Sequence, residues 1–117
     1  MKIVIFGASG RTGKHLILQA LERGHTVTAF ARTPGKVLVR HEYLQIIQGD
    51  IHDAMTVEKA VVGQDVVLCA LGINKDEPVT ALADGTKIII TAMRKHHIRR
   101  ILNVSAAGFS GERADFL

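Results

Sequence analysis

Three glycines spaced three residues apart form the part of the sequence best suited to chemistry. Gly7, Gly10 and Gly13 stand in the segment IFGASGRTGKHL, where an apolar run ends and a helical pattern begins. A glycine turn at a helix start is typical of phosphate binding, because the helix offers free N–H groups and a partial positive charge. The first glycine permits the turn, the second lets the backbone approach a pyrophosphate, and the third allows close packing of helix on strand. We therefore expect a pyrophosphate cradle; the alternative is a plain turn.

The spacing distinguishes this motif from related phosphate loops. It reads G-x-x-G-x-x-G rather than the common dinucleotide fingerprint G-x-G-x-x-G, so the glycines alone are weak evidence. The stretch GASGRTGK also lacks the G-x-x-x-x-G-K-S/T spacing of a nucleoside triphosphate loop. What favours a dinucleotide is the position of the motif between a strand and a helix.

The end of the second apolar segment indicates which dinucleotide would bind. A site for NAD carries Asp or Glu there, about 20 residues past the glycines, to bind the ribose hydroxyls. This sequence reads AFARTPGK instead, with Arg32 and Lys36 and no carboxylate. A guanidinium can grip a 2′-phosphate through two charge-assisted hydrogen bonds, and Arg11 in the glycine loop adds a further positive charge. The pattern favours NADP(H); the alternative is that Arg32 is a solvated surface residue.

These residues need a scaffold, and apolar runs alternate with helical patterns along the chain. Asp53 is a helix cap, Gly24 and Gly63 are helix stops, and Pro34 with Gly35 disfavours a helix before Tyr43. We expect strands over 2–7, 25–32, 44–50, 65–72 and 99–108, and helices over 12–23, 53–62 and 79–96.

The alternation predicts a Rossmann-type, doubly wound parallel sheet with right-handed crossovers. We expect five strands in the order 3-2-1-4-5 and one domain over residues 1–117, without linker or internal repeat. Ligands bind such sheets at the carboxyl ends of the strands, where the strand order reverses. The glycine loop follows the first strand and lies at that point.

Composition narrows the range of functions. The net charge of +4 suits a polyanionic ligand without requiring nucleic acid, and 4% aromatic residues argue against a base-stacking surface. No apolar run approaches the roughly 20 residues of a membrane span. Cys69 is the only cysteine, and the apolar start is too short for an export signal, so we expect a cytoplasmic protein.

Five segments, GASGRTG, ARTPGK, QGDIHD, CALG and NVSAAG, resemble a known family in order and interval. They are similar to the atypical short-chain dehydrogenase/reductases, in particular the NAD(P)H-binding NmrA-like group and its flavin- and biliverdin-reducing branch. The resemblance covers almost the whole chain, and the glycine motif with the arginine after the second strand is its most specific part. It implies an NADP(H)-binding domain.

The resemblance also implies which residues bind each part of the cofactor. The pyrophosphate would be lined by the glycine loop, through Gly7, Ser9, Gly10, Arg11, Thr12 and Gly13. The 2′-phosphate would meet Arg32 and Lys36, and the adenine would lie between Asp50 and Ile51. The linking ribose would lie near Leu71 and Gly72, and the nicotinamide near Ser105, the candidate catalytic residue. For Asp50 the alternative is a turn residue at a strand end.

The sequence departs from the family pattern in two ways. The family continues past the fifth strand with units that shape the substrate pocket, whereas this sequence stops at Leu117, so we expect an incomplete enzyme. The Tyr-x-x-x-Lys pair of the wider superfamily is also missing, because Tyr43 is the only tyrosine and position 47 is Ile47. Its absence leaves hydride transfer with a proton from water as the expected chemistry.

Other candidates carry less weight. The basic stretch RKHHIRR (94–100) falls at a helix end opposite the cofactor side, which favours a solvated, dipole-stabilising role over nucleic-acid binding. The histidines show no metal-ligand spacing, and Cys69 lies in an apolar strand. Two functions remain open: an NADPH-dependent reductase acting on a flavin, quinone or tetrapyrrole-like acceptor, and a non-catalytic NAD(P)H sensor acting on a partner.

Overall fold

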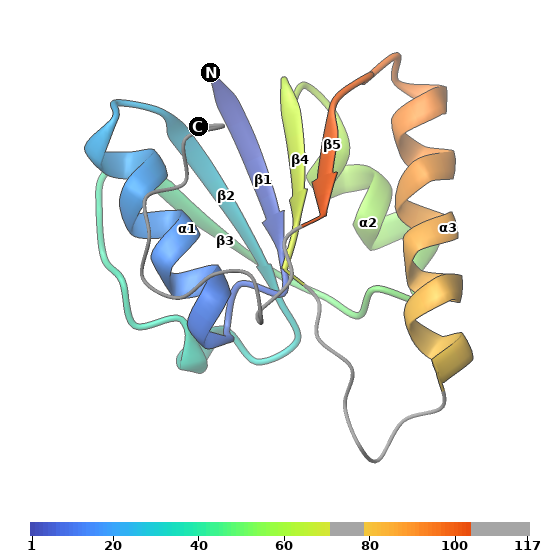
Figure 1. Ribbon diagram of the computed structural model, residues 1–117, viewed down its shortest axis with the longest axis horizontal. Helices are drawn as coiled ribbons and strands as arrows, with labels where there is room; N and C mark the ends of the chain where they lie inside the picture. Colours follow the sequence, from blue (N-terminus) through green and yellow to red (C-terminus); the bar gives the residue numbers. More distant parts are fainter. Residues whose placement is uncertain (71–78, 104–117) are drawn as a thin grey trace.

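The computed structural model describes residues 1–70 and 79–103. For residues 79–83 it describes the backbone only. Its parallel sheet has the order β3-β2-β1-β4-β5, which confirms the predicted order (Figure 1). The strands are β1 (Lys2–Phe6), β2 (Thr26–Ala31), β3 (Leu44–Gln48), β4 (Val66–Cys69) and β5 (Ile101–Asn103). The helices are α1 (Arg11–Glu22), α2 (Ala54–Val61) and α3 (Val79–Lys95).

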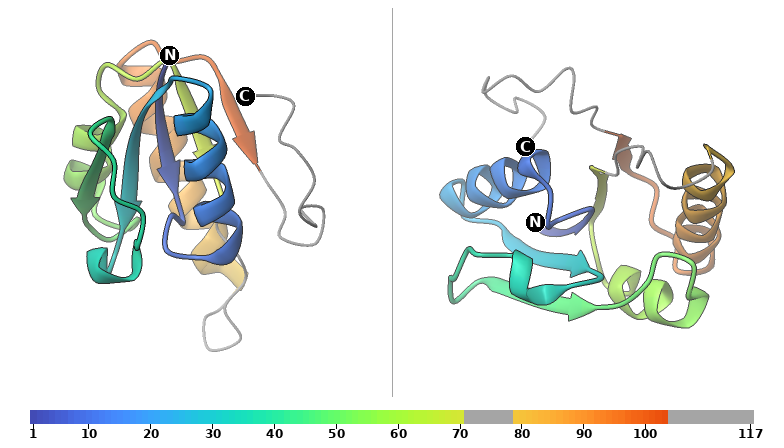
Figure 2. Two further views of the ribbon diagram at one scale, coloured as in Figure 1. Left: turned by 90° about the vertical axis from the view of Figure 1, so that its left-hand side faces the viewer. Right: turned by 90° about the horizontal axis from the view of Figure 1, so that it is seen from below.

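The helices cover both faces of the sheet, α1 on one face and α2 with α3 on the other (Figure 2). A hydrophobic layer lies under each face. Ile3 and Ile5 of β1 pack in the layer under α1, whereas Val4 and Phe6 pack in the layer under α2 and α3. All four side chains have no exposed surface. β1 is therefore buried on both faces, which explains its continuous apolar run.

The backbone confirms the predicted helix cap and helix stops, and the observed helix bounds lie within one residue of the predicted ones. Gly24 and Gly63 follow α1 and α2 with φ of 84° and 77°, in the left-handed region that favours glycine. Asp53 caps α2: its carboxylate accepts the backbone N–H of Met55 at 3.2 Å and the hydroxyl of Thr56 at 2.6 Å. These local signals place the loops, and so the ends of the strands.

The connection from β2 to β3 contains no α-helix. It holds a single 3-10 turn, η1 (Pro34–Lys36), as the proline and glycine in this segment predict. Val37 and Val39 then pack against the layer under α1. The segment thus lies beside α1, near the glycine loop.

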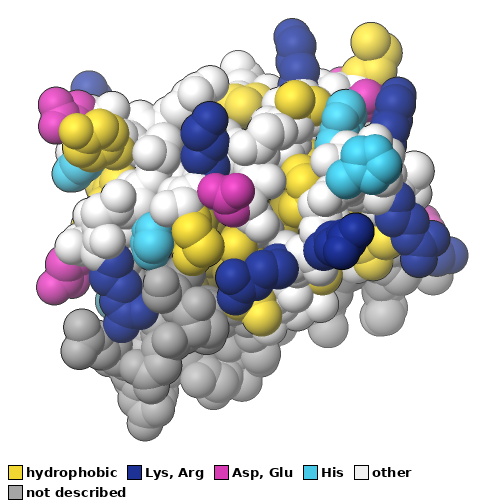
Figure 3. All heavy atoms as spheres, turned by 90° about the horizontal axis from the view of Figure 1, so that it is seen from above, with side chains coloured by type: hydrophobic (Ala, Val, Ile, Leu, Met, Phe, Trp, Pro, Cys, Tyr) yellow, Lys and Arg dark blue, Asp and Glu magenta, His cyan; other side chains and the backbone are white. Residues whose placement is uncertain are grey.

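The expected strand over 99–108 is observed only as β5, because residues 104–108 lie outside the described part of the chain. At the amino ends of the strands, the end of α3 is tied to α2. Lys95 Nζ and His96 Nε2 each lie 3.0 Å from Glu58 Oε1. Figure 3 shows basic side chains spread over this face with acidic and histidine side chains among them. None of the described helices has the length and apolar character needed to cross a membrane.

Candidate dinucleotide-binding site

The glycine loop forms a sharp turn from β1 into α1. Gly7 has a φ of 81°, a conformation that side chains other than glycine rarely adopt. The N–H of Gly10 donates to the carbonyl oxygen of Gly7 at 3.3 Å, and the carbonyl of Gly10 accepts the N–H of Lys14 at 3.0 Å. Gly10 is the N-cap of α1, so the loop ends where the first helical N–H groups point outward.

Gly13 is required by packing. A Cβ at this position would lie 2.8 Å from the Cα of Ala8 and would also meet the carbonyl oxygen of Gly7. Real Cβ atoms do not come that close to backbone atoms, so only glycine lets α1 lie against the loop. This is the packing role that the sequence predicts.

Gly10 is different, because the fold does not require a glycine there. Its φ of −80° and ψ of 172° are open to any residue. A Cβ there would lie 3.7 Å from the carbonyl oxygen of Gly7, which is an ordinary contact distance. The glycine therefore keeps free a space beside the helix N-terminus that a phosphate could occupy.

The start of α1 also suits an anion electrostatically. Its first turn carries no acidic residue, and Ser9, Gly10 and Arg11 are exposed. Thr12 is only 8% exposed, so a ligand could reach little of its side chain. The partial positive charge of the helix N-terminus is not offset by a carboxylate in that turn.

A cavity of about 300 Å³ lies at the carboxyl ends of β1, β2 and β3. It brings together five residues predicted for the cofactor site, and no acidic side chain is among its described lining residues. The lining residues are Gly7, Ser9, Phe30, Ala31, Arg32, Thr33, Lys36, Gly49 and Ile51.

The sequence did not predict the other four lining residues, Phe30, Ala31, Thr33 and Gly49. A Cβ on Gly49 would lie 2.8 Å from Cζ of Phe30, so glycine lets the end of β3 pack against this ring. The segment QGD at the end of β3 contains the signal, but its meaning depends on Phe30 in the neighbouring strand.

A second cavity, of about 260 Å³, lies between α1 and the segment after η1. It shares Ser9 and Lys36 with the first cavity, and its other lining residues are Ala8, Gly10, Arg11, Lys14, Ile17, Val37, Leu38 and Val39. The sequence did not predict this cavity, because it depends on how residues 36–39 pack on α1.

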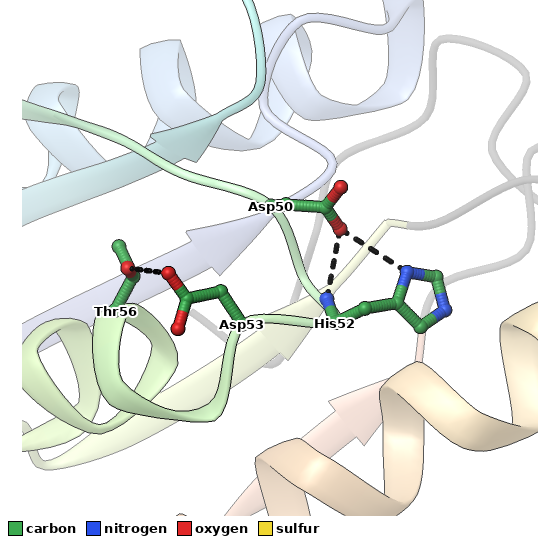
Figure 4. A network of polar contacts seen from close by, with 4 residues as sticks. All are labelled: Asp50, His52, Asp53 and Thr56. Atoms are coloured by element: carbon green, nitrogen blue, oxygen red, sulfur yellow. Dashed lines mark hydrogen bonds and ion pairs between the residues drawn. The ribbon is translucent and has the colours of Figure 1, made fainter.

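Asp50 follows β3 and holds the loop that leads to α2 (Figure 4). Its Oδ1 accepts the backbone N–H of His52 at 2.8 Å and lies 3.1 Å from His52 Nδ1. The backbone N–H of His52 is the main cause that lowers the pKa of Asp50, and the His52 ring and the positive charge of Arg32 add to it. The turn role of Asp50 is thus observed, while its contact with adenine stays a prediction.

Ile51 places an apolar side chain at the cavity. It lines the space beside Arg32 and also packs over Gly85 of α3, where a Cβ would lie 2.9 Å from Ile51 Cδ1. Asp50 itself is not among the lining residues of this cavity. The two residues predicted to flank adenine are therefore adjacent, but only Ile51 faces the cavity.

Three predicted site residues, Leu71, Gly72 and Ser105, lie outside the described residues. Cys69 at the end of β4 is 4% exposed, and burial raises the pKa of its thiol to about 12, so it is no nucleophile. Tyr43 is 55% exposed just before β3. Within the part of the chain that the structure describes, no three His, Cys, Asp or Glu side chains form a metal site.

Known proteins are similar to this chain in sequence and in fold. The sequence profile of a family described as NAD(P)H-binding matches residues 7–117. A 3-beta-hydroxysteroid dehydrogenase from Mycolicibacterium neoaurum is 38% identical over 113 residues, covering 86% of this chain and 31% of that protein.

Two solved structures with bound dinucleotides also align with the chain. A short-chain dehydrogenase/reductase from Veillonella parvula in complex with NADP has a TM-score of 0.71 and 26% identity, covering 95% of this chain and 50% of that one. WbmG from Bordetella bronchiseptica in complex with NAD has a TM-score of 0.75 and 26% identity, covering 88% of this chain and 36% of that one.

The chain spans only part of its relatives' length, including 18% of the 3 beta-hydroxysteroid dehydrogenase/Delta 5-->4-isomerase of Mycobacterium tuberculosis (strain CDC 1551 / Oshkosh). The glycine loop, the sheet order and the profile match agree with one another. The chain belongs to the NAD(P)H-binding family and forms a Rossmann-type NAD(P)H-binding domain related to dehydrogenases and reductases.

Proposed function

We propose that this chain is the NADP(H)-binding domain of an NADPH-dependent reductase. The observation that carries the choice of NADP(H) over NAD(H) is the lining of the larger cavity. Arg32 directly follows β2, where an NAD site would offer a carboxylate, and Lys36 of η1 lines the same cavity. No acidic side chain is among the described lining residues.

The residues of the chain have separate tasks in this proposal. The open space at Gly10 and the N-terminus of α1 take the pyrophosphate, and Ile51 offers an apolar contact to the adenine. Arg32 supplies a planar pair of N–H donors and Lys36 a point charge for the 2′-phosphate. The dinucleotide, when bound, supplies the hydride.

The acceptor we propose is a flavin, quinone or tetrapyrrole-like molecule. The support is the resemblance of the sequence to NmrA-like proteins and within them to biliverdin reductase B, a flavin reductase. As the resemblance implies, Ser105 would lie near the nicotinamide, and the proton donor we propose is water. The acceptor wall would come from a part of the protein beyond these residues, and we propose a cytoplasmic location.

The cofactor preference is tested by replacing Arg32 with Ala and measuring affinity for NADPH and NADH. A charge-assisted hydrogen bond contributes about 1.5–3 kcal/mol, which corresponds to roughly ten- to a hundredfold in affinity. Arg32→Ala should weaken NADPH binding by that factor and leave NADH binding nearly unchanged. Arg94→Ala, at an exposed position on α3, is the matched control and should change neither.

Equal losses for both cofactors would mean that Arg32 supports the fold or the pyrophosphate site, and a wild-type preference for NADH would overturn the assignment. The reductase itself is tested by following NADPH oxidation with flavin and quinone acceptors, using the longest natural form of the protein. Tight NADPH binding without turnover would favour the sensor role instead.

A further inference from the structure

We propose that the 2′-phosphate binds where the two cavities meet, and that Lys14 of α1 is a further residue that selects NADP(H). This inference rests on the proposed function. It adds a binding position for the 2′-phosphate, which we call the seat, and one further residue. Ser9 and Lys36 line both cavities, so a group bound between them is in reach of the side chains of each. The smaller cavity adds Arg11 and Lys14 to the set.

Charge supports this seat. A phosphate monoester carries nearly two negative charges at neutral pH, which is about twice the charge of each diester-like phosphate in the pyrophosphate. The two cavities are lined by four cationic side chains, Arg11, Lys14, Arg32 and Lys36, and neither described lining contains Asp or Glu. This is more positive charge than the pyrophosphate alone needs.

The position of Lys14 explains how it reaches the seat. Its N–H bonds to the carbonyl oxygen of Gly10, so Lys14 stands one helical turn after the N-cap on the side that faces residues 36–39. Its side chain is exposed, whereas Ile17, one turn further, is fully buried. Apolar walls from Ile17 and Val37 lower the local polarity and strengthen the attraction of the lysine for an anion.

Two of these cations, Lys14 and Lys36, have no carboxylate partner in the described part of the chain. By contrast, Lys95 is paired with Glu58. Arg32 also feels the carboxylate of Asp50, which offsets part of its positive charge. Lys14 therefore contributes more to the binding of a 2′-phosphate than the sequence pattern indicates.

The test replaces Lys14 with Gln, which removes the charge and keeps a polar side chain that is one atom shorter. Binding is measured for NADPH and NADH, and for adenosine 2′,5′-bisphosphate and 5′-AMP, which isolate the 2′-phosphate from the nicotinamide. Lys14→Gln should weaken NADPH and the bisphosphate about three- to tenfold, since a solvent-facing charge pair contributes less than a buried one. NADH and 5′-AMP should bind as before.

Two controls make the result specific. Lys14→Arg should restore binding and its dependence on salt, and Lys87→Gln, at an exposed position on α3, should change nothing. If the wild-type protein prefers NADPH but Lys14→Gln binds all four ligands as the wild type does, or weakens all four equally, this seat is wrong while the proposed function stands. If the wild type shows no preference for the 2′-phosphate, the proposed function fails as well.

Discussion

Gly10 and Gly13 share one loop and one residue type, yet the structure assigns them opposite tasks. Gly10→Ser should leave the fold intact, because serine adopts a φ of −80° freely and is a favoured N-cap. The free energy of unfolding should change by only a few tenths of a kcal/mol. The oxygen of the new hydroxyl would accept a hydrogen bond from a backbone N–H in the first turn of α1. In the proposed site, that N–H donates to the pyrophosphate instead.

Gly10→Ser should therefore weaken the binding of NADPH while leaving the stability of the fold almost unchanged. Losing one hydrogen bond to a charged group costs about 1.5–3 kcal/mol, so the dissociation constant for NADPH should rise roughly ten- to a hundredfold. NADH should lose as much, because the pyrophosphate is common to both. This equal loss separates Gly10 from Arg32 and Lys14.

Gly13→Ala should show the reverse pattern. Its Cβ meets backbone atoms of Gly7 and Ala8, which cannot rotate away, so overpacking costs up to about 3 kcal/mol. Alanine favours the helix by about 1 kcal/mol relative to glycine. The free energy of unfolding should therefore fall by about 2 kcal/mol, which lowers the melting temperature by roughly 10 °C.

The assay combines thermal unfolding by circular dichroism with titration of NADPH fluorescence, since the chain has no tryptophan to report binding. The reasoning fails if Gly10→Ser binds NADPH as tightly as the wild type. It also fails if Gly10→Ser melts as early as Gly13→Ala.

Two further predictions concern groups away from the cavities. Glu58→Gln should lower the melting temperature at pH 7, because the variant loses the carboxylate that binds Lys95 and His96. The bond from Lys95 is the main cause that lowers the pKa of Glu58 in the fold, so its contribution is fully present above the usual value of 4.5 and is lost as the pH falls from there through the lowered pKa. The melting temperatures of variant and wild type should converge as the pH falls through this range, and a constant difference at every pH would contradict this. Cys69 should resist thiol reagents at pH 8 until denaturant is added, because its thiol is buried with a pKa of about 12; rapid labelling of the native protein would contradict its placement.

The sequence was informative wherever a signal is local. Apolar runs, the cap at Asp53 and the stops at Gly24 and Gly63 predicted the elements and, through the crossover rule, the order of the strands. The first three predicted strands run one or two residues past the observed ends, since their ranges include residues such as Arg32 and Asp50 that follow the last paired position. The local motif also predicted which loop would stand beside the carboxyl ends of β1 and β2.

What could not be predicted depends on residues distant in sequence. The smaller cavity exists because residues 36–39 lie on α1, and nothing in either segment alone indicates this contact. The bond between Asp50 and His52 needs one turn geometry among several that the sequence allows. From the sequence alone, Lys14 is a solvated lysine on a helix surface. Only the fold shows that it shares a cavity with residues 36–39.

The central place of β1 in the sheet also constrains how the protein folds. β1 pairs with β2, which follows after one helix, and with β4, where Ile3 stands beside Val66. Joining β1 to β4 closes a loop of about 60 residues, so this contact carries a larger entropic cost than the first pairing. We expect β1, α1 and β2 to assemble early. The face of this partly formed sheet that α2 and α3 later cover would then be exposed to water. During synthesis that side stays uncovered until α2 and β4 have emerged, which makes this interval the one in which the chain is most exposed to aggregation.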